Sequence, residues 1–234
     1  MIRIFLLLAA LFLAACDAGT PTLQTLPAPV RPTAPAVSVS QPVAAFRQVV
    51  DRMEPVIERE CRRRTRGMDC DFVLLLNTNP RLPPNAFQTL GDNGKPVLGF
   101  TIALLEDMRN TDEMAFVVGH EAAHHISNHL ERQRQNATLG ATTLGVLAQM
   151  SGATAQGVRE AAEFGAALGA RSYSKDFELE ADQLGTILTL IAGYNPVRGA
   201  EYFNRIPDPG NRFLGTHPPN AQRIAIVRRT AAGL

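Results

Sequence analysis

The chain has 234 residues, of which 45% are hydrophobic and 19% are charged, a composition that suits one globular domain with a sizeable core and short appendages. Its formal net charge is +1. General nucleic-acid binders carry a strong positive charge, so we expect no nucleic-acid partner. The densest charge run, RECRRRTRG at residues 59–67, indicates a solvated helix end, with contact to anionic lipid headgroups as the alternative.

The first residues have the pattern of an export signal. Arg3 precedes an apolar run at residues 4–13, which is too short for a comfortable membrane span. Small residues then lead to Cys16, and the ending LAAC resembles the lipobox of bacterial lipoproteins, in which the cysteine is lipidated and begins the mature chain. We therefore expect a lipoprotein signal peptide over residues 1–15; an ordinary signal peptide that contains a cysteine is the alternative.

Residues 16–42 are rich in proline, threonine, alanine and serine, which predicts an extended tether before a domain at residues 43–234.

Export also changes the interpretation of Cys61 and Cys70. They are nine positions apart, a spacing that can close into a disulfide in an oxidising compartment. A reduced pair is the alternative, whereas metal ligation is disfavoured because neither a CxxC spacing nor a nearby histidine accompanies them.

The first half of this domain has patterns of both helix and strand. A helical pattern covers residues 43–64, with Pro55 as a point where the helix can kink. Residues 71–76 predict a short buried strand, which the turn-rich sequence NTNPRLPPNAF follows. Residues 95–101 predict a second strand, which leads into a helix at 101–109.

The rest of the chain is predicted to be helical. Thr111 can cap a long helix that runs to about residue 134, and the two acidic residues after it suit the positive end of the helix dipole. The Ala- and Gly-rich segment 136–172 predicts core-packed or mobile helices, because no uninterrupted span is long enough to cross a bilayer; a membrane-facing or lid role stays open. Further helices are predicted at residues 174–194, 196–206 and 218–234.

Four of the five histidines lie in VVGHEAAHHISNHL, residues 117–130, which contains the pattern HExxH. On a helix, positions four apart project about 40° from each other, so His120 and His124 can bind one tetrahedral ion. Glu121 lies about 100° from His120, too far to join that face. It can instead hold a water molecule whose pKa the metal lowers towards about 7, and take its proton.

His125 and His129 are also four positions apart and therefore compete for a metal. They project about 140° and 180° from His120, whereas apolar side chains flank the edge that carries the first pair. A catalytic zinc requires a dry and supported cavity, which favours that edge. We expect His125 and His129 to be exposed or to have a secondary role.

A third protein ligand is required, with a fourth position left open. The segment SKDFELEAD, residues 174–182, places Glu178 and Asp182 four apart on one helix face. Glu180 projects about 200° from Glu178 and should point away. The face therefore offers one carboxylate to the metal and a second to support the site.

The segments GHEAAHHI, SKDFELEAD, AGYNP and THPPNAQRI occur in the order seen in the M48 peptidases, a gluzincin family of zinc metallopeptidases. The chain resembles this family over about residues 43–230. The resemblance implies an α+β, mainly helical, zincin-like fold with a small sheet beside the HExxH helix. It also implies that residues 95–101 form an edge strand against which an extended peptide binds by backbone pairing.

The resemblance assigns roles to the candidate residues. It implies one Zn2+ per chain with His120, His124 and Glu178 as ligands. Glu121 is then the general base, and Asp182 is the carboxylate that orients a ligand histidine.

His217, in the segment THPP, corresponds to a family histidine near the active site. By resemblance it stabilises the oxyanion or occupies the open zinc position in a resting state. The alternative is a turn residue beside two prolines.

These patterns together predict a zinc-dependent endopeptidase of the bacterial cell envelope, facing the periplasm and lipid-anchored to the inner or the outer membrane. Family roles imply unfolded or misassembled envelope proteins as its substrates. The main alternative is a zinc-stabilised, non-proteolytic chaperone or assembly lipoprotein, but Glu121 argues against it because binding alone requires no base. A structural lipoprotein with a vestigial site is a third class, which predicts no stoichiometric zinc.

Overall fold

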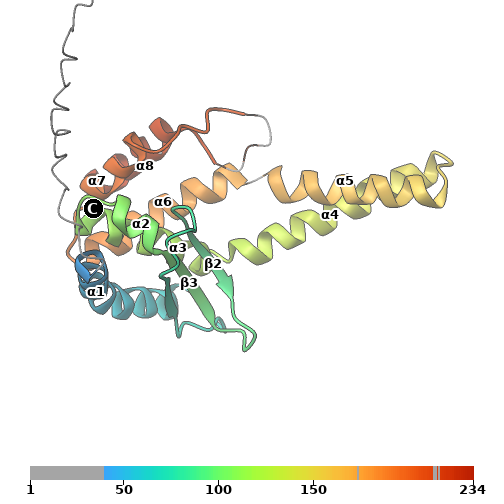
Figure 1. Cartoon of the computed structure of the whole chain (residues 1–234). Coiled ribbons are helices and arrows are strands. Elements are labelled where there is room, and N and C mark those ends of the chain that lie inside the picture. Colours follow the sequence, from blue (N-terminus) through green and yellow to red (C-terminus); the bar gives the residue numbers. More distant parts are fainter. Residues whose placement is uncertain (1–39, 173, 213–214, 216) are drawn as a thin grey trace, which may run out of the picture. The chain divides into compact units, whose positions relative to one another are not determined.

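The computed structural model describes residues 40–172, 174–212, 215 and 217–234 (Figure 1). The predicted signal peptide, Cys16 and the tether up to residue 39 lie outside the described residues. The first helix begins at Ser40, so the last three residues of the predicted tether form its first turn. Among the described residues, no helix is both long enough and apolar enough to cross a membrane.

The chain has a mainly helical α+β fold with a small mixed sheet, as predicted. The described elements are, in chain order, α1 (Ser40–Arg64), β1 (Val73–Asn77), β2 (Ala86–Leu90), β3 (Pro96–Thr101), α2 (Ile102–Asp107), α3 (Thr111–Ile126), α4 (His129–Met150), α5 (Ala155–Ser172), α6 (Ser174–Ile191), α7 (Pro196–Gly199), the 3-10 helix η1 (Ala200–Asn204) and α8 (Asn220–Ala232).

The described strands form one sheet in the order β1-β3-β2, with β1 parallel and β2 antiparallel to β3. The expectation that residues 95–101 form the edge strand is therefore wrong. Five of the six residues of β3 are buried, which is typical of a strand covered on both faces. β1 and β2 form the two edges instead. The sequence does not predict β2 because a turn-rich segment with three prolines comes just before this short strand.

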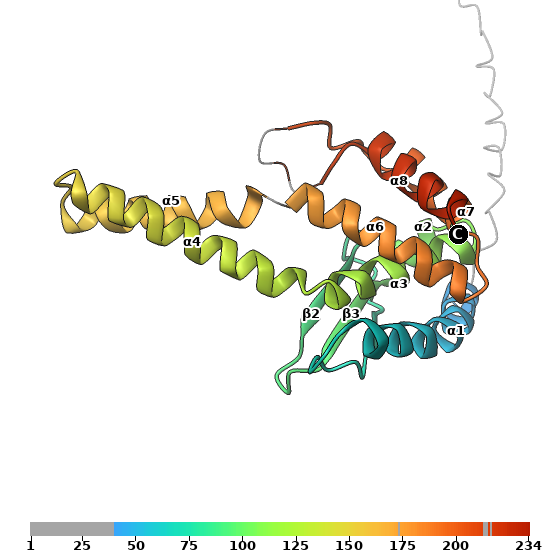
Figure 2. The same ribbon diagram turned by 180° about the vertical axis from the view of Figure 1, so that it is seen from behind.

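α3 is the central helix of the domain, and thirteen of its sixteen residues are buried. It packs against α6, against α1 and against the sheet (Figure 2). A Cβ atom added to Gly119 would lie 2.9 Å from the carbonyl oxygen of Gly185, and one added to Gly185 would lie 2.9 Å from the backbone nitrogen of His120. The two backbones can approach this closely only because neither glycine has a side chain.

The long helix predicted from Thr111 to about residue 134 is in fact two helices. α3 ends at Ile126, and Asn128 has a left-handed backbone conformation with φ of 56° before α4 begins at His129. Asparagine adopts this conformation more readily than most residues. The backbone N–H of Asn128 also donates to the carbonyl of His125 at 2.8 Å, which closes the last turn of α3.

The Ala- and Gly-rich segment forms α4 and α5, which pack along each other and make most of their contacts with each other (Figure 2). Gly140 and Gly165 face each other at this contact, and a Cβ atom on either would lie within 2.2 Å of the other's carbonyl oxygen. This segment is thus a helical hairpin whose close packing requires small residues.

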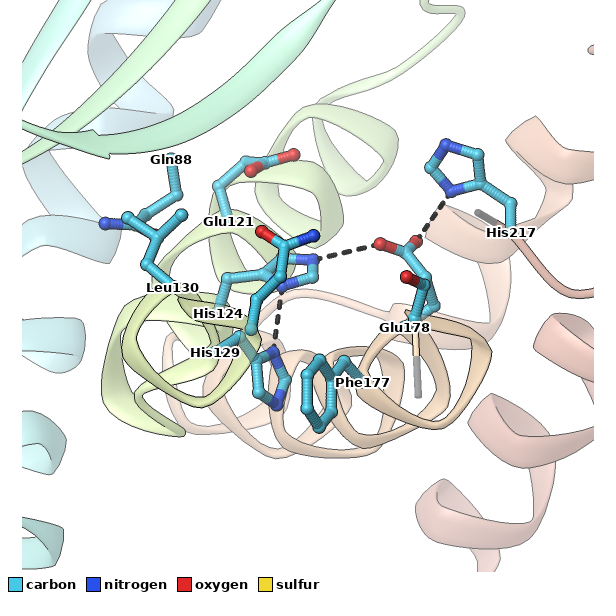
Figure 3. Close-up of a pocket in the computed structure, with 10 residues that line it drawn as sticks. Gln88, Glu121, His124, His129, Leu130, Phe177, Glu178 and His217 are labelled. Carbon is cyan, nitrogen blue, oxygen red and sulfur yellow. Dashed lines mark hydrogen bonds and ion pairs between the residues drawn. The ribbon is translucent and has the colours of Figure 1, made fainter. Parts of the chain in front are cut away.

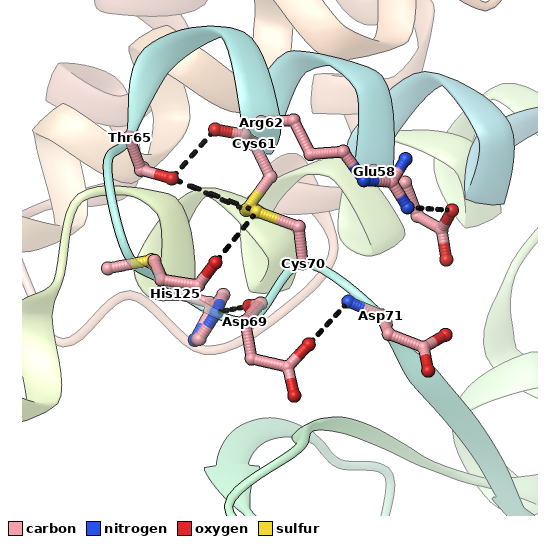
Figure 4. Close-up of a disulfide and its surroundings, with 9 residues drawn as sticks. Glu58, Cys61, Arg62, Thr65, Asp69, Cys70, Asp71 and His125 are labelled. Carbon is pink, nitrogen blue, oxygen red and sulfur yellow. Dashed lines mark hydrogen bonds and ion pairs between the residues drawn. A yellow bond between two sulfur atoms is a disulfide. The ribbon is translucent and has the colours of Figure 1, made fainter.

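A disulfide between Cys61 and Cys70 joins the end of α1 to the segment before β1 (Figure 4). Both cysteines are buried in the core. Thr65 donates its hydroxyl to the carbonyl of Cys61 at 2.8 Å, and the Nε2 atom of His125 lies 2.7 Å from the carbonyl oxygen of Asp69. The disulfide and these hydrogen bonds hold the loop between α1 and β1 against α3.

Replacing both cysteines with alanine is expected to lower the free energy of unfolding by about 2–4 kcal/mol, because the unfolded chain then loses a covalent constraint. Urea unfolding measures this change. Wild-type protein in a strong reductant should match the double variant, and the reductant should leave the double variant unchanged. A double variant as stable as oxidised wild type would contradict the structural role of this disulfide.

Candidate metal centre

The three predicted zinc ligands lie together where α3 packs against α6. His120 Nε2 is 3.0 Å from His124 Nε2, and the two oxygens of Glu178 are 3.6 Å from His120 Nε2 and 3.3 Å from His124 Nε2. Ligand distances of about 2.0–2.1 Å around a tetrahedral zinc separate its donor atoms by about 3.3 Å. The donor atoms of this His-His-Glu group, all within 4.8 Å of one another, therefore fit a single zinc ion.

Asp182 fixes the outer nitrogen of His120. Its Oδ1 atom is 2.9 Å from His120 Nδ1, and its side chain is completely buried. Because a carboxylate only accepts hydrogen bonds, His120 must carry its proton on Nδ1 in this contact. The lone pair of Nε2 is then available to a metal ion.

Arg223, on α8, is a site residue that the sequence did not reveal. Its Nε and Nη2 atoms donate to the two oxygens of Asp182, both at 2.7 Å, and Nη2 also lies 3.4 Å from Glu178 Oε2. The guanidinium packs over the ring of Phe203 at 4.1 Å from its centroid. Arginine is seldom buried, so its residue type assigns Arg223 to the solvent. Its place in the segment THPPNAQRI and its spacing of four residues from Val227, on the same helix face, are the signals that could have found it.

Both carboxylates of this cluster are held in their charged form. Burial by itself raises the pKa of Glu178, but hydrogen bonds from His124 and His217 hold that pKa well below its usual range. Burial also raises the pKa of Asp182, but the positive charge of Arg223 and its hydrogen bonds lower it below the ordinary value. The centre therefore presents fixed negative charge, which suits a divalent cation.

Glu121 lies beside the donor atoms and at the junction of two cavities. The cavities have volumes of about 210 and 600 Å³, and both are lined by Glu121, His124, Glu178 and His217. Figure 3 shows the smaller cavity. Burial raises the pKa of Glu121, and the neighbouring histidines oppose this rise. A carboxylate with a raised pKa beside a cavity is suited to accept and release a proton.

The edge strand β2 runs beside these two cavities and contributes residues to the wall of each. Gln88 lines the smaller cavity and Ala86 lines the larger one. The free edge of a strand offers unpaired backbone groups to an extended peptide. Of the strands in this sheet, β2 rather than β3 therefore has an open edge beside the centre.

His217 lies in the segment before α8 and reaches the centre (Figure 3). Its Nδ1 atom is 3.0 Å from Glu178 Oε2, and its side chain is about half exposed. This contact places the ring of His217 beside a predicted metal ligand.

The expectation that His125 and His129 are exposed is wrong, because both are buried. The break at Asn128 ends the helical periodicity on which that expectation depended, and the ring of His129 lies next to that of His124. Burial lowers the pKa of His125, and burial together with the charge of His124 lowers the pKa of His129 to about 4. Both rings are therefore neutral near pH 7.

A family model described as Peptidase family M48 matches residues 47–231, which is most of the chain. This range includes the disulfide pair Cys61 and Cys70 and every residue of the centre described above. A search of curated proteins finds no match.

Replacing Arg223 with Met is expected to lower the free energy of unfolding by about 3–5 kcal/mol, because it leaves the buried charge of Asp182 without its partner. Urea unfolding measures the loss. Arg62→Met is the matched control: Arg62 pairs with Glu58 at 2.8 Å at the surface, so its loss is expected to cost less than about 1 kcal/mol. Equal losses in the two variants would contradict this assignment.

Proposed function

The chain belongs to peptidase family M48 and is a zinc metallopeptidase, and from this premise we propose that it is an endopeptidase acting on unfolded or misassembled proteins of the bacterial cell envelope. The observation that carries the proposal is the placement of Glu121 beside the His-His-Glu donor set, at the junction of two cavities and next to a free strand edge. Binding a metal for stability alone requires neither the base nor the cavities.

His120 and His124 would hold one zinc through their Nε2 atoms, and Glu178 would hold it through its carboxylate. When bound, zinc supplies a Lewis acid that polarises the scissile carbonyl and lowers the pKa of the attacking water. Glu121 accepts a proton from that water and passes it to the leaving amine. Asp182 keeps His120 in the tautomer that ligation requires.

An extended substrate would bind along β2. Its backbone would pair with the free edge of this strand, and the scissile bond would then lie between the two cavities and close to Glu121. Backbone pairing is largely independent of side chains, and it requires a segment that is not already folded. This mode of binding favours unfolded or misassembled proteins as substrates.

His217 has two candidate roles at this centre. The ring of His217 lies beside Glu178, one of the proposed metal ligands. For a substrate carbonyl bound at the metal, a nitrogen of this ring would donate a hydrogen bond to the developing oxyanion. In a resting state, the same ring could instead fill the fourth metal position. We favour the first role because the ring is half exposed at the side of both cavities.

The envelope location rests on the export pattern of residues 1–15 and on Cys16 as the site of lipidation. The buried disulfide between Cys61 and Cys70 supports it, because disulfides persist in oxidising compartments. We propose a lipid anchor in the inner or the outer membrane, with the peptidase domain facing the periplasm.

Replacing Glu121 with Gln is expected to retain one zinc per chain and to lower casein hydrolysis by at least about 100-fold, because the amide cannot accept the proton. Metal analysis and a proteolysis assay on the same preparation measure both properties, with wild type plus chelator as the inactive reference. Casein turnover by Glu121→Gln at the wild-type rate would contradict this mechanism. A wild type that binds zinc and retains unfolded casein without cutting it would instead favour the chaperone alternative.

Replacing His217 with Ala is expected to lower casein hydrolysis by about 100-fold or more at saturating zinc, because the oxyanion loses a donor. The zinc content should stay at one per chain. An increase in hydrolysis would show that His217 blocks the centre in a resting state, and would reject its role at the oxyanion.

A further inference from the structure

His124 has a second histidine at its outer nitrogen. The Nδ1 atoms of His124 and His129 lie 2.9 Å apart, so one ring donates a hydrogen bond to the other (Figure 3). His120 has the carboxylate of Asp182 at the equivalent atom, at 2.9 Å. Each of the two histidine ligands is therefore held at Nδ1, but by a different kind of group.

Ligation decides the direction of the hydrogen bond between the two rings. When His124 presents the lone pair of Nε2 to a metal, its proton is on Nδ1, and His129 must accept through its own Nδ1. The proton of neutral His129 is then on Nε2, which lies 3.3 Å from Glu180 Oε2. That buried Nε2 atom has no well-aligned hydrogen-bond partner among the described residues, and Glu180 is the acceptor closest to providing one.

Three contacts hold His129 and Glu180 in place. The ring of His129 stacks on Phe177 with 4.6 Å between the ring centroids and 11° between the planes. Arg132 donates to Glu180 Oε2 at 2.8 Å, and its guanidinium lies 4.3 Å from the centroid of Phe177. The side chain of His129 is only 5% exposed, so its ring has little freedom to turn away from His124.

We propose that His129, supported by Glu180 and Arg132, positions His124 for zinc by fixing its tautomer and the orientation of its ring. This inference rests on the proposed function, because it requires zinc at His120, His124 and Glu178. The helix α6 then serves both histidine ligands, His120 directly through Asp182 and His124 through Glu180 and His129. Partners of this kind typically contribute 10–100-fold to metal affinity.

The break between α3 and α4 makes this arrangement possible. On a continuous helix, His129 would project about 140° away from His124. The left-handed residue Asn128 turns the chain so that the first residue of α4 faces back towards α3 and α6. A positioning role for His129 gives this conformation a function.

The test compares zinc affinity in full-length variants by competition with a chromophoric chelator, and it records the visible absorption of the Co2+-substituted proteins. His129→Ala is expected to weaken zinc binding by about 10–100-fold and to change the Co2+ spectrum. His129→Asn should recover part of the affinity, because its amide oxygen can accept from His124 Nδ1. Glu180→Ala should weaken binding in the same direction but by less.

Two matched controls separate positioning from stability. His125→Ala removes another buried histidine from the same segment, one whose Nε2 lies against Asp69 rather than against a ligand, and its zinc affinity should stay within about threefold of wild type. Glu163→Ala removes an exposed glutamate from α5 and should change neither affinity nor spectrum.

Unchanged affinity and an unchanged Co2+ spectrum in folded His129→Ala would overturn the inference. If that variant does not fold, Glu180→Ala decides instead, because the side chain of Glu180 is 44% exposed and its loss is tolerable; wild-type affinity there would overturn the inference equally. Failure of the wild type to bind zinc at all would be a different result, since it would reject the proposed function itself.

Discussion

The metal centre depends on the close contact between α3 and α6 at Gly119 and Gly185. Backbone atoms rather than side chains meet at this point, so α6 lies near enough for its carboxylates to reach the imidazoles of α3. Glu178 and Asp182 lie within the two helical turns before Gly185, which places them opposite the HExxH turn. A side chain at either glycine would push the helices apart and move the donor atom of α6 away from those of α3.

The second requirement of the centre is compensation of its buried charge. Two carboxylates on one helix face are costly to bury, because water no longer solvates them. Arg223 offsets this cost for Asp182 through two charge-assisted hydrogen bonds, and its Nη2 atom also lies 3.4 Å from Glu178 Oε2. Since Arg223 is on α8, the last helix of the chain, the centre is complete only after the C-terminal helix has packed against α6.

Much of this centre could be predicted from the sequence because its parts are local. The spacing of His120 and His124, and that of Glu178 and Asp182, lies within single helices, where a period of 3.6 residues decides which side chains share a face. The small sheet was predicted less well. In the structure, the burial of five of its six residues marks β3 as a central strand. The order of the strands depends on partners that are distant in the sequence. The edge position of β2 therefore appears only in the folded chain.

The sequence by itself determined the chemistry of this protein: a pair of histidines with a glutamate between them, and a second helix that carries two carboxylates at matching spacing. Only the tertiary structure decided how these groups are supported. The left-handed residue Asn128 ends the period of α3 and returns His129 to His124, and the packing of α8 brings in Arg223. A helical period holds only as far as the helix continues, and contacts between separate helices follow from packing rather than from spacing.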